Sequence, residues 1–173
     1  MLQSILPLYN AKYADTLQEE FIYQYDLSPI ISASCKNLFS EFADHNLIMG
    51  AEVADGAIDV LTYLSKYHDI YFVTAGHPYT AAARDDFLSM HFPFYRSSHL
   101  IVCREKQLLN VDVLIDDYEN NLIGGTYEKI LMTKPWNEHV ATNLYGIKRI
   151  FGWDEVPKII ENYERRERNT LWT

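Results

Sequence analysis

Two sets of polar residues follow short apolar runs in the middle of the chain. Val73-Thr74-Ala75-Gly76 closes one run, and Ile115-Asp116-Asp117 closes another. A hydroxyl group and free backbone N–H groups at a turn from a strand into a helix can bind an anion. Two adjacent carboxylates at a strand end repel each other and lose hydration, and a hard cation such as Mg²⁺ relieves both costs. These residues therefore predict a phosphate site beside a divalent metal.

Lys106 is the third residue of this set. It precedes Asp116 by ten positions, and its ammonium group could reach over the strand end to hold carboxylate and phosphate oxygens together. Each residue also has an ordinary interpretation. Thr74 could cap a helix, the two aspartates could begin a solvated loop, and Lys106 could be a surface lysine. The prediction depends on the three occurring together.

Short apolar runs alternate with amphipathic stretches over most of the chain. Strands are predicted at 69–74, 100–103, 111–115 and 129–133, and helices at 2–13, 56–67, 78–90 and 153–166. The run at 69–74 is almost wholly apolar, which is typical of a strand buried on both faces. This alternation predicts an α/β fold with a doubly wound, Rossmann-like parallel sheet, whose sites lie beyond the carboxyl ends of the strands.

The first third of the chain is predicted to be helical throughout. Thr16 with Glu19 resembles a capping box for a second short helix. Ser32 or Ser34 could cap a third helix. The apolar face of that helix would consist of Leu38, Phe39 and Phe42.

Composition restricts the class of protein. The 173 residues fit one domain, and 48% of them are hydrophobic, which is enough for a full core. A net charge of −9 argues against a nucleic-acid polymer as partner but allows a small phosphorylated ligand. No apolar run is long enough for a membrane span. Cys35 and Cys103 read as buried thiols in a reducing compartment, so a cytoplasmic protein is expected.

A strand-end threonine, a lysine and a strand-end Asp-Asp pair, in this order, resemble the haloacid dehalogenase (HAD) superfamily of phosphohydrolases. More narrowly, the chain resembles the 5'(3')-deoxyribonucleotidase family of cytosolic type C. The resemblance runs from about Leu6 to Tyr163. It is carried by Leu8-Tyr9-Asn10-x-x-Tyr13, Tyr25-Asp26-Leu27, Gly56-Ala57, Tyr71-Phe-Val-Thr-Ala75, Leu114-Ile-Asp-Asp117, Pro135-Trp136-Asn137 and Gly152-Trp153.

The resemblance implies roles for the residues around the phosphate. Thr74, with the backbone amide of Ala75, would hold the phosphate of a nucleoside monophosphate. Lys106 would neutralise the phosphoryl group and the attacking carboxylate. Asn137 matches a position where the family has a polar residue near the substrate. The implied activity is that of a phosphoric monoester hydrolase of the 5'-nucleotidase type.

The resemblance also implies a metal site and a domain plan. Asp116 and Asp117 would bind Mg²⁺ directly or through water. Residues 1–173 would form a single HAD-like domain, in which about 14–50 make a small helical cap and 51–165 make the α/β core. Tyr23, Tyr25 and Phe42 are candidates for stacking on a base, and packing of the cap on the core is the alternative. His77 could face the site or lie on the surface.

One part of the family's site has no counterpart in the printed sequence. Family members begin with a buried central strand that ends in Asp-x-Asp, whose first carboxylate attacks phosphorus and whose second is the general acid and base. That strand belongs immediately before the helix at 2–13, and Met1 to Leu6 carry no carboxylate. Asp15 and Asp26 fall in the cap. We therefore expect the nucleophile to be absent from this chain.

Three explanations of this absence stay open. The true start could lie upstream, the strand could come from another chain, or the protein could be a relative that no longer hydrolyses phosphate. Exposed sheet edges would favour a homodimer. Accordingly, three functions are considered: a Mg²⁺-dependent nucleotidase, an inactive binding or regulatory relative, and an HAD phosphatase for a non-nucleotide ester.

Overall fold

The computed structural model describes residues 2–27, 29–32, 45–76 and 78–170. Several predictions fall outside these residues. They are the third helix with its cap Ser34, its apolar side chains Leu38, Phe39 and Phe42, the thiol of Cys35, and the orientation of His77.

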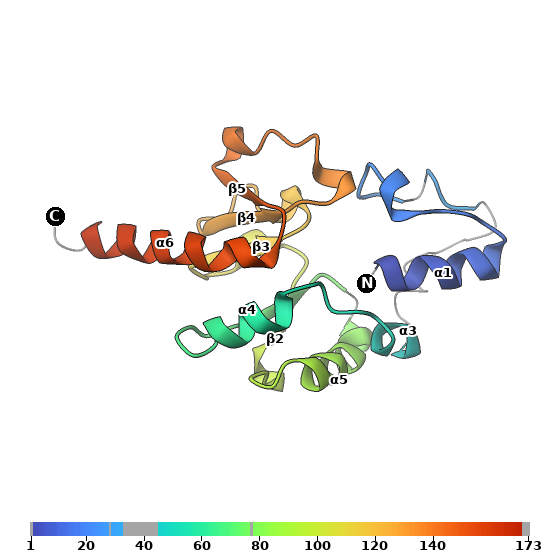
Figure 1. Cartoon of the computed structure of the whole chain (residues 1–173), viewed down its shortest axis with the longest axis horizontal. Helices are drawn as coiled ribbons and strands as arrows, with labels where there is room; N and C mark the ends of the chain where they lie inside the picture. Colours follow the sequence, from blue (N-terminus) through green and yellow to red (C-terminus); the bar gives the residue numbers. More distant parts are fainter. Residues whose placement is uncertain (1, 28, 33–44, 77, 171–173) are drawn as a thin grey trace.

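The described chain alternates helices with short strands (Figure 1). The α-helices are α1 (Leu2–Tyr13), α3 (His45–Met49), α4 (Ala57–Leu64), α5 (Ala81–His91) and α6 (Val156–Thr170). The strands are β1 (Phe72–Thr74), β2 (Leu100–Val102), β3 (Val113–Asp116), β4 (Glu128–Met132) and β5 (Ile147–Ile150). The 3-10 turns are η1 (Glu19–Phe21), η2 (Pro78–Thr80), η3 (Ser97–His99), η4 (Lys106–Leu108), η5 (Glu119–Asn121), η6 (Pro135–Asn137), η7 (Thr142–Tyr145) and η8 (Trp153–Glu155).

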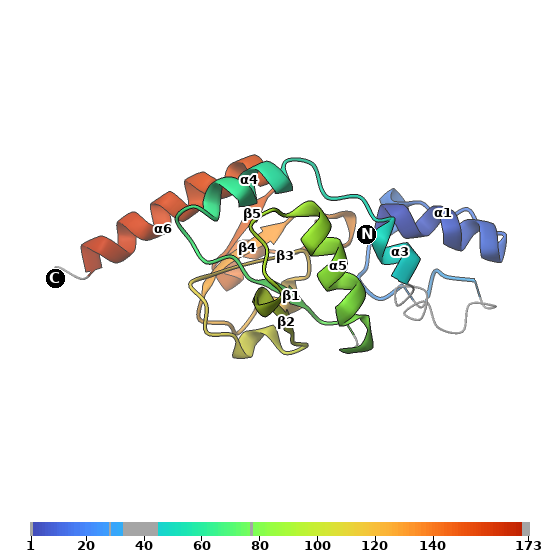
Figure 2. The ribbon, with the colours of Figure 1, turned by 90° about the horizontal axis from the view of Figure 1, so that it is seen from below.

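The strands form two parallel sheets. One pairs β1 with β2, and Thr74 lies opposite Val102. The other has the order β3-β4-β5, with Asp116 opposite Leu131. In the views of Figures 1 and 2, β3 is the strand of the second sheet nearest the β1–β2 pair. Parallel strands joined by crossover segments confirm the predicted α/β, Rossmann-like fold class.

Strand β3 faces two different parts of the core because its side chains alternate. Val113 and Ile115 pack with a cluster under the helices, whose buried members are Leu64, Ile130, Ile150 and Val156. Leu114 points to the opposite face, where the buried cluster consists of Leu114, Leu122, Tyr127, Leu131 and Ile147. Because side chains alternate along the strand, Asp116 lies on the same face of the sheet as Leu114. Loops cover this face, and long helices cover the other.

Helix α4 links the two sheets. Leu64 packs in the cluster beneath the β3-β4-β5 sheet, while Leu61 packs with Leu88 and Phe92 beside β1 and β2. Helix α6 lies next to α4 on the same side of the strands (Figure 2). Helix α4 therefore packs against the cores of both sheets, although the sheets share no strand.

The middle and end of the chain largely match the predicted elements, with three differences. Strand β1 has only three residues and is half-buried, so the expectation of a strand buried on both faces is wrong; β1 has one strand neighbour. Helix α4 ends at Leu64, three residues early. Strand β5 was not predicted, because Lys148 and Arg149 interrupt its apolar pattern.

The N-terminal third differs more strongly from the prediction. Between Tyr13 and Ser32, the described residues contain one 3-10 turn, η1, so this part is not helical throughout. Thr16 caps no helix, and Gln18 is the residue before η1. The side chain of Asn10 explains the extended path. Its amide donates to the Leu17 carbonyl at 2.8 Å, and its oxygen accepts from the Leu17 N–H at 3.0 Å, so these backbone groups need no helix.

Among the described residues, no helix is long and apolar enough to cross a membrane.

Candidate functional site

Asp116 ends strand β3 and is 8% exposed. Its Oδ2 accepts a hydrogen bond from Lys106 Nζ at 2.6 Å. Asn121 Nδ2 lies 3.1 Å from both carboxylate oxygens, and the Tyr118 N–H donates to Oδ1 at 3.0 Å. A carboxylate has about four lone-pair positions. All of them are engaged, so Asp116 is a fully satisfied anion.

Lys106 begins the 3-10 turn η4 and is equally buried, at 8% exposure. Its charge is compensated by Asp116. The turn is tied to the loop after β3 by the hydroxyl of Tyr127, which donates to the carbonyls of Asn121 at 2.6 Å and Lys106 at 3.4 Å. The structure thus brings together two of the residues that the sequence analysis selected, and the surface interpretation of Lys106 is wrong.

Asp117 differs from its neighbour because its charge is poorly compensated. Burial, and then repulsion from Asp116, raise the pKa of Asp117 to about 6, while Lys106 and Lys134 act in the opposite direction. Within the described residues Asp117 takes part in no ion pair. A half-buried carboxylate with a raised pKa is the kind of group that a cation would stabilise.

The backbone of Asp117 is held by the turn η6. Trp136 Nε1 and Asn137 Nδ2 both donate to the Asp117 carbonyl at 2.9 Å. Asn137 is completely buried and also donates to the Met132 carbonyl at 2.8 Å. Its oxygen accepts from the Lys134 N–H at 3.1 Å and from Arg149 Nη1 at 3.0 Å. Asn137 therefore has no hydrogen-bonding capacity left for a substrate and fits a positioning role.

Sequence reasoning missed two residues of this network. Asn121 supports Asp116 from the turn after β3, and Arg149 reaches Asn137 from β5. Arg149 also donates to the carbonyls of Asn137 and Val140, each at 3.0 Å. A signal for Arg149 was present, because an arginine in the middle of a short buried strand needs internal partners.

Thr74 ends β1 in the other sheet and is half-buried. Its hydroxyl oxygen accepts from the Gly76 N–H at 3.1 Å, and its carbonyl accepts from the Cys103 N–H at 2.9 Å. The hydroxyl of Thr74 can still donate one hydrogen bond, and Ala75 is exposed. The groups of this strand-end turn could bind an anion, or they could serve only to cap the following helix.

Tyr25 connects the two strand ends electrostatically. Its ring stacks on Tyr118 with the ring centres 3.8 Å apart and an angle of 11° between the planes. The pKa of Tyr25 is raised to about 12 by burial first, then by Asp117, Asp116 and Tyr118, whereas Arg84 lowers it. The pKa of Tyr25 is thus influenced both by the acidic pair at the end of β3 and by Arg84 of helix α5, which follows β1. The ends of β1 and β3 therefore lie on the same side of the molecule, around Tyr25.

The donor set allows a divalent cation of the magnesium type. No group of three or more His, Cys, Asp or Glu side chains gathers for a metal in the described parts of the chain. Mg²⁺ does not require such a group, because it commonly binds through one or two carboxylates together with water and phosphate. Asp117 fits this role better than Asp116, whose oxygens are engaged.

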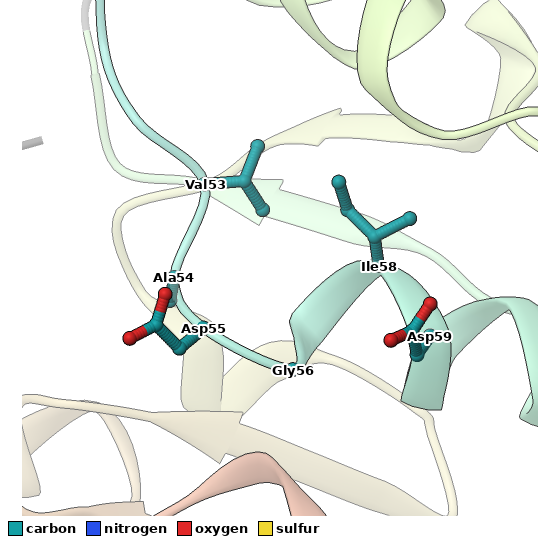
Figure 3. A pocket seen from close by; sticks show the side chains of 6 residues that line it. All are labelled: Val53, Ala54, Asp55, Gly56, Ile58 and Asp59. Carbon is teal, nitrogen blue, oxygen red and sulfur yellow. The ribbon is translucent and has the colours of Figure 1, made fainter.

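Two surface depressions lie elsewhere. One, of about 270 Å³, is formed by the loop before α4 and the first turn of that helix (Figure 3). Its carboxylates, Asp55 and Asp59, would repel a phosphate. The other, of about 300 Å³, is formed by residues that precede β1 and β2, at the amino ends of these strands. Neither depression contains Thr74, Lys106, Asp116 or Asp117.

Comparison with known proteins agrees with the resemblance in the sequence. The family model described as "5' nucleotidase, deoxy (Pyrimidine), cytosolic type C protein" matches residues 1–166. A 5'(3')-deoxyribonucleotidase of Bacillus subtilis is 28% identical over 144 residues, which cover 82% of this chain and 80% of the relative. A protein of the same name from Clostridium acetobutylicum is 28% identical over 131 residues, covering 75% and 73%.

Proposed function

Because the chain belongs to the family of cytosolic type C deoxy 5' nucleotidases, we propose that it forms the phosphate-transfer site of a phosphatase acting on nucleoside monophosphates. The observation that carries the proposal is the buried Lys106–Asp116 ion pair beside Asp117 at the end of β3. Placing Lys106, Asp116 and Asp117 at one strand end costs desolvation free energy. A purely structural role could be filled by apolar residues without that cost.

In this proposal each residue has a separate role at the phosphate or at the acidic pair. Thr74 and the Ala75 amide bind the phosphate from the β1 side. Lys106 keeps the acidic pair from repelling the phosphate, since its ammonium group sits on Asp116 at 2.6 Å. Asn137 contributes indirectly by fixing the Asp117 backbone. Lys106 and Thr74 are the proposed catalytic residues of the described chain.

The proposed cofactor is Mg²⁺, held by Asp117 with Asp116 close by. When bound, it would neutralise phosphate oxygens as charge moves toward the leaving oxygen. The raised pKa of Asp117 supports this assignment, because its carboxylate gains most from a nearby cation. A divalent metal is what the family implies in general, and magnesium is our specific proposal.

We propose that the attacking carboxylate is carried on a strand between β1 and β3, outside the printed sequence. The two separate sheets support this, because β1 and β3 each have a hydrogen-bonded neighbour on one edge only within the described chain. An inserted parallel strand would pair with both edges and place its last residues beside Thr74 and Asp116. A homodimer that pairs these edges is the competing arrangement.

We also propose that about 14–50 form a cap over a core of 51–165, within one domain spanning 1–173. Three described contacts support a cap. Ile22 packs with Leu6 and Trp136, and Tyr25 stacks on Tyr118. Glu19 pairs with Lys134 at 3.5 Å. The cap therefore rests on the loops after β3 and β4, next to the acidic pair.

One observation favours a second candidate, a non-catalytic binding protein. The carboxylate best aligned at a strand end, Asp116, is neutralised by Lys106 and fully hydrogen-bonded. It is therefore a poor nucleophile, and Asp117, the other carboxylate at this strand end, is the one assigned to the cation. Without an added carboxylate, the chain would bind a phosphate and release it unchanged.

The test is phosphate release from deoxynucleoside monophosphates and from sugar phosphates, each with MgCl₂. The printed chain is compared with a version extended by the natural preceding codons. Turnover of nucleotides by the extended version alone, lost in Asp117→Asn but kept in Asp112→Asn, is the expected result. Preference for sugar phosphates would reassign the substrate. Phosphate binding without turnover by either version would establish the binding protein.

A further inference from the structure

Arg84 is a half-buried cation that has no role in the site described so far. It lies in the first turn of α5, the helix that follows β1. Its Nε atom is shielded from solvent and has no hydrogen-bond partner among the described residues. Arg84 also takes part in no ion pair there. By contrast, the buried Lys106 has Asp116 at 2.6 Å.

The guanidinium group of Arg84 lies against the turn that ends β1. A Cβ atom added at Gly76 would come within 3.2 Å of both Nε and Nη2 of Arg84 and within 3.1 Å of Thr80 Oγ1. Only the missing side chain of Gly76 leaves room for the guanidinium at this place. Since the Gly76 N–H donates to the Thr74 hydroxyl, Arg84 and Thr74 belong to the same turn.

No carboxylate compensates the charge of Arg84 within the described parts of the chain. Burial lowers the pKa of Arg84, and the opposing influence comes from Tyr25, a phenol that is neutral at ordinary pH. Leaving a guanidinium partly buried without a carboxylate costs free energy. An anion at the turn would recover that cost, and a guanidinium is well shaped to donate two hydrogen bonds to phosphate oxygens.

We propose that Arg84 is a phosphate-binding residue. It contacts the phosphate oxygens from the Thr74 side, while Lys106 acts from the Asp116 side. The inference rests on the proposed function, because it assumes that the anion at the Thr74 turn is the substrate phosphate. The competing explanation is that Arg84 only packs on Gly76 and supports the turn.

The experiment measures binding of inorganic phosphate by titration calorimetry, in the whole chain and with MgCl₂ present. The variants are Arg84→Met, Arg84→Lys, Gly76→Ala and Thr74→Val. The matched control is Arg96→Met, because Arg96 is exposed and precedes β2 at the opposite end of the strand. Thermal unfolding without phosphate reports the structural role separately.

Arg84→Met should weaken phosphate binding by about 10- to 100-fold, as expected for a lost hydrogen bond to a charged group. Arg84→Lys should recover part of it, and Gly76→Ala should weaken binding by pushing the guanidinium aside. Arg96→Met should bind as the unaltered chain does. A matching drop in unfolding temperature should not occur, because the guanidinium has no ion-pair partner to lose among the described residues.

Two outcomes would overturn the inference. If Thr74→Val weakens phosphate binding and Arg84→Met does not, the phosphate site stands but Arg84 is structural. If the unaltered chain binds no phosphate, the proposed function and this inference fail together. The two failures are therefore distinguishable.

Discussion

At the scale of residues, the neighbouring aspartates at the end of β3 have opposite environments. Asp116 is neutralised by Lys106 and hydrogen-bonded on both oxygens, whereas the pKa of Asp117 is raised to about 6. Asp116 is therefore a fixed structural anion, and Asp117 is a carboxylate that a bound cation would stabilise. The difference arises from which side of the strand end Lys106 approaches.

Lys106→Met should destabilise the fold strongly. It would leave Asp116 buried at 8% exposure with an uncompensated charge, and breaking such a pair costs about 3–5 kcal/mol. The double variant Lys106→Met/Asp116→Asn should recover much of this loss. Urea unfolding of the single and double variants measures the coupling. Equal stability of the two would show that the pair is not an energetic unit.

Asp117→Asn should stabilise the apo protein at neutral pH. The pKa of Asp117 is higher in the folded chain than in the unfolded chain, so the folded state binds the extra proton. Stability therefore falls as pH rises from about 4 to about 6, by up to about 3 kcal/mol. Urea unfolding at pH 5 and pH 7.5 should show this loss in the unaltered chain and little of it in Asp117→Asn.

Mg²⁺ should reverse that loss. If Asp117 holds the cation, MgCl₂ at pH 7.5 should raise the unfolding temperature of the unaltered chain through linkage. Asp117→Asn should not respond, while Asp112→Asn, whose side chain is exposed, should respond normally. An equal response in all three proteins would place the cation elsewhere.

At the scale of elements, the turn η6 and strand β5 form the frame for the acidic pair. Asn137 joins the Asp117 carbonyl, the Met132 carbonyl and Arg149, so it couples β4 and β5 to the loop after β3. All of these contacts are made within the protein. Their effect on activity would come through the position of Asp117.

Asn137→Ala should therefore lower stability and loosen the site together. It removes the side-chain donor to the Met132 carbonyl, one of the two donors to the Asp117 carbonyl and one acceptor of Arg149. Each group left unsatisfied costs about 1–3 kcal/mol. Asn143→Ala, in an exposed turn, is the control. Urea unfolding measures the loss, and Mg²⁺ titration measures whether the cation site weakens. Unchanged stability would contradict the buried network.

The sequence predicted the elements that carry uninterrupted apolar runs. The strands Leu100–Val102, Val113–Asp116 and Glu128–Met132 were predicted for this reason. The expected closeness of Lys106 to Asp116 is also observed, while their function stays a prediction. Strand β5 was missed because its charged residues find partners inside the fold, which only tertiary structure reveals. The second predicted helix does not form, because the side chain of Asn10, seven residues earlier, satisfies the Leu17 backbone groups. Arg84 was missed because a helical arginine normally points to solvent.

At the scale of the whole molecule, the main feature is the separation of the two sheets. Helix α4 contacts the cores beneath both sheets, yet β1 and β3 are not hydrogen-bonded to each other. In a parallel strand, N–H groups point alternately to the two edges. About half of the amides in β1 and β3 therefore face the region between the sheets.

These amides provide the test of the inserted strand. Hydrogen exchange of the printed chain should be fast for the amides of β1 and β3 that face between the sheets, since they lack a strand partner. In the version extended by the natural preceding codons, the same amides should become protected. Ile130 in β4, flanked by β3 and β5, should be protected in both versions and serves as the internal control. Equal exchange in β1 and β3 of the two proteins would exclude the inserted strand, whatever the extended version does to nucleotides. If these amides of the unextended chain become protected as the protein concentration rises, the edges of β1 and β3 pair between two copies of the chain instead.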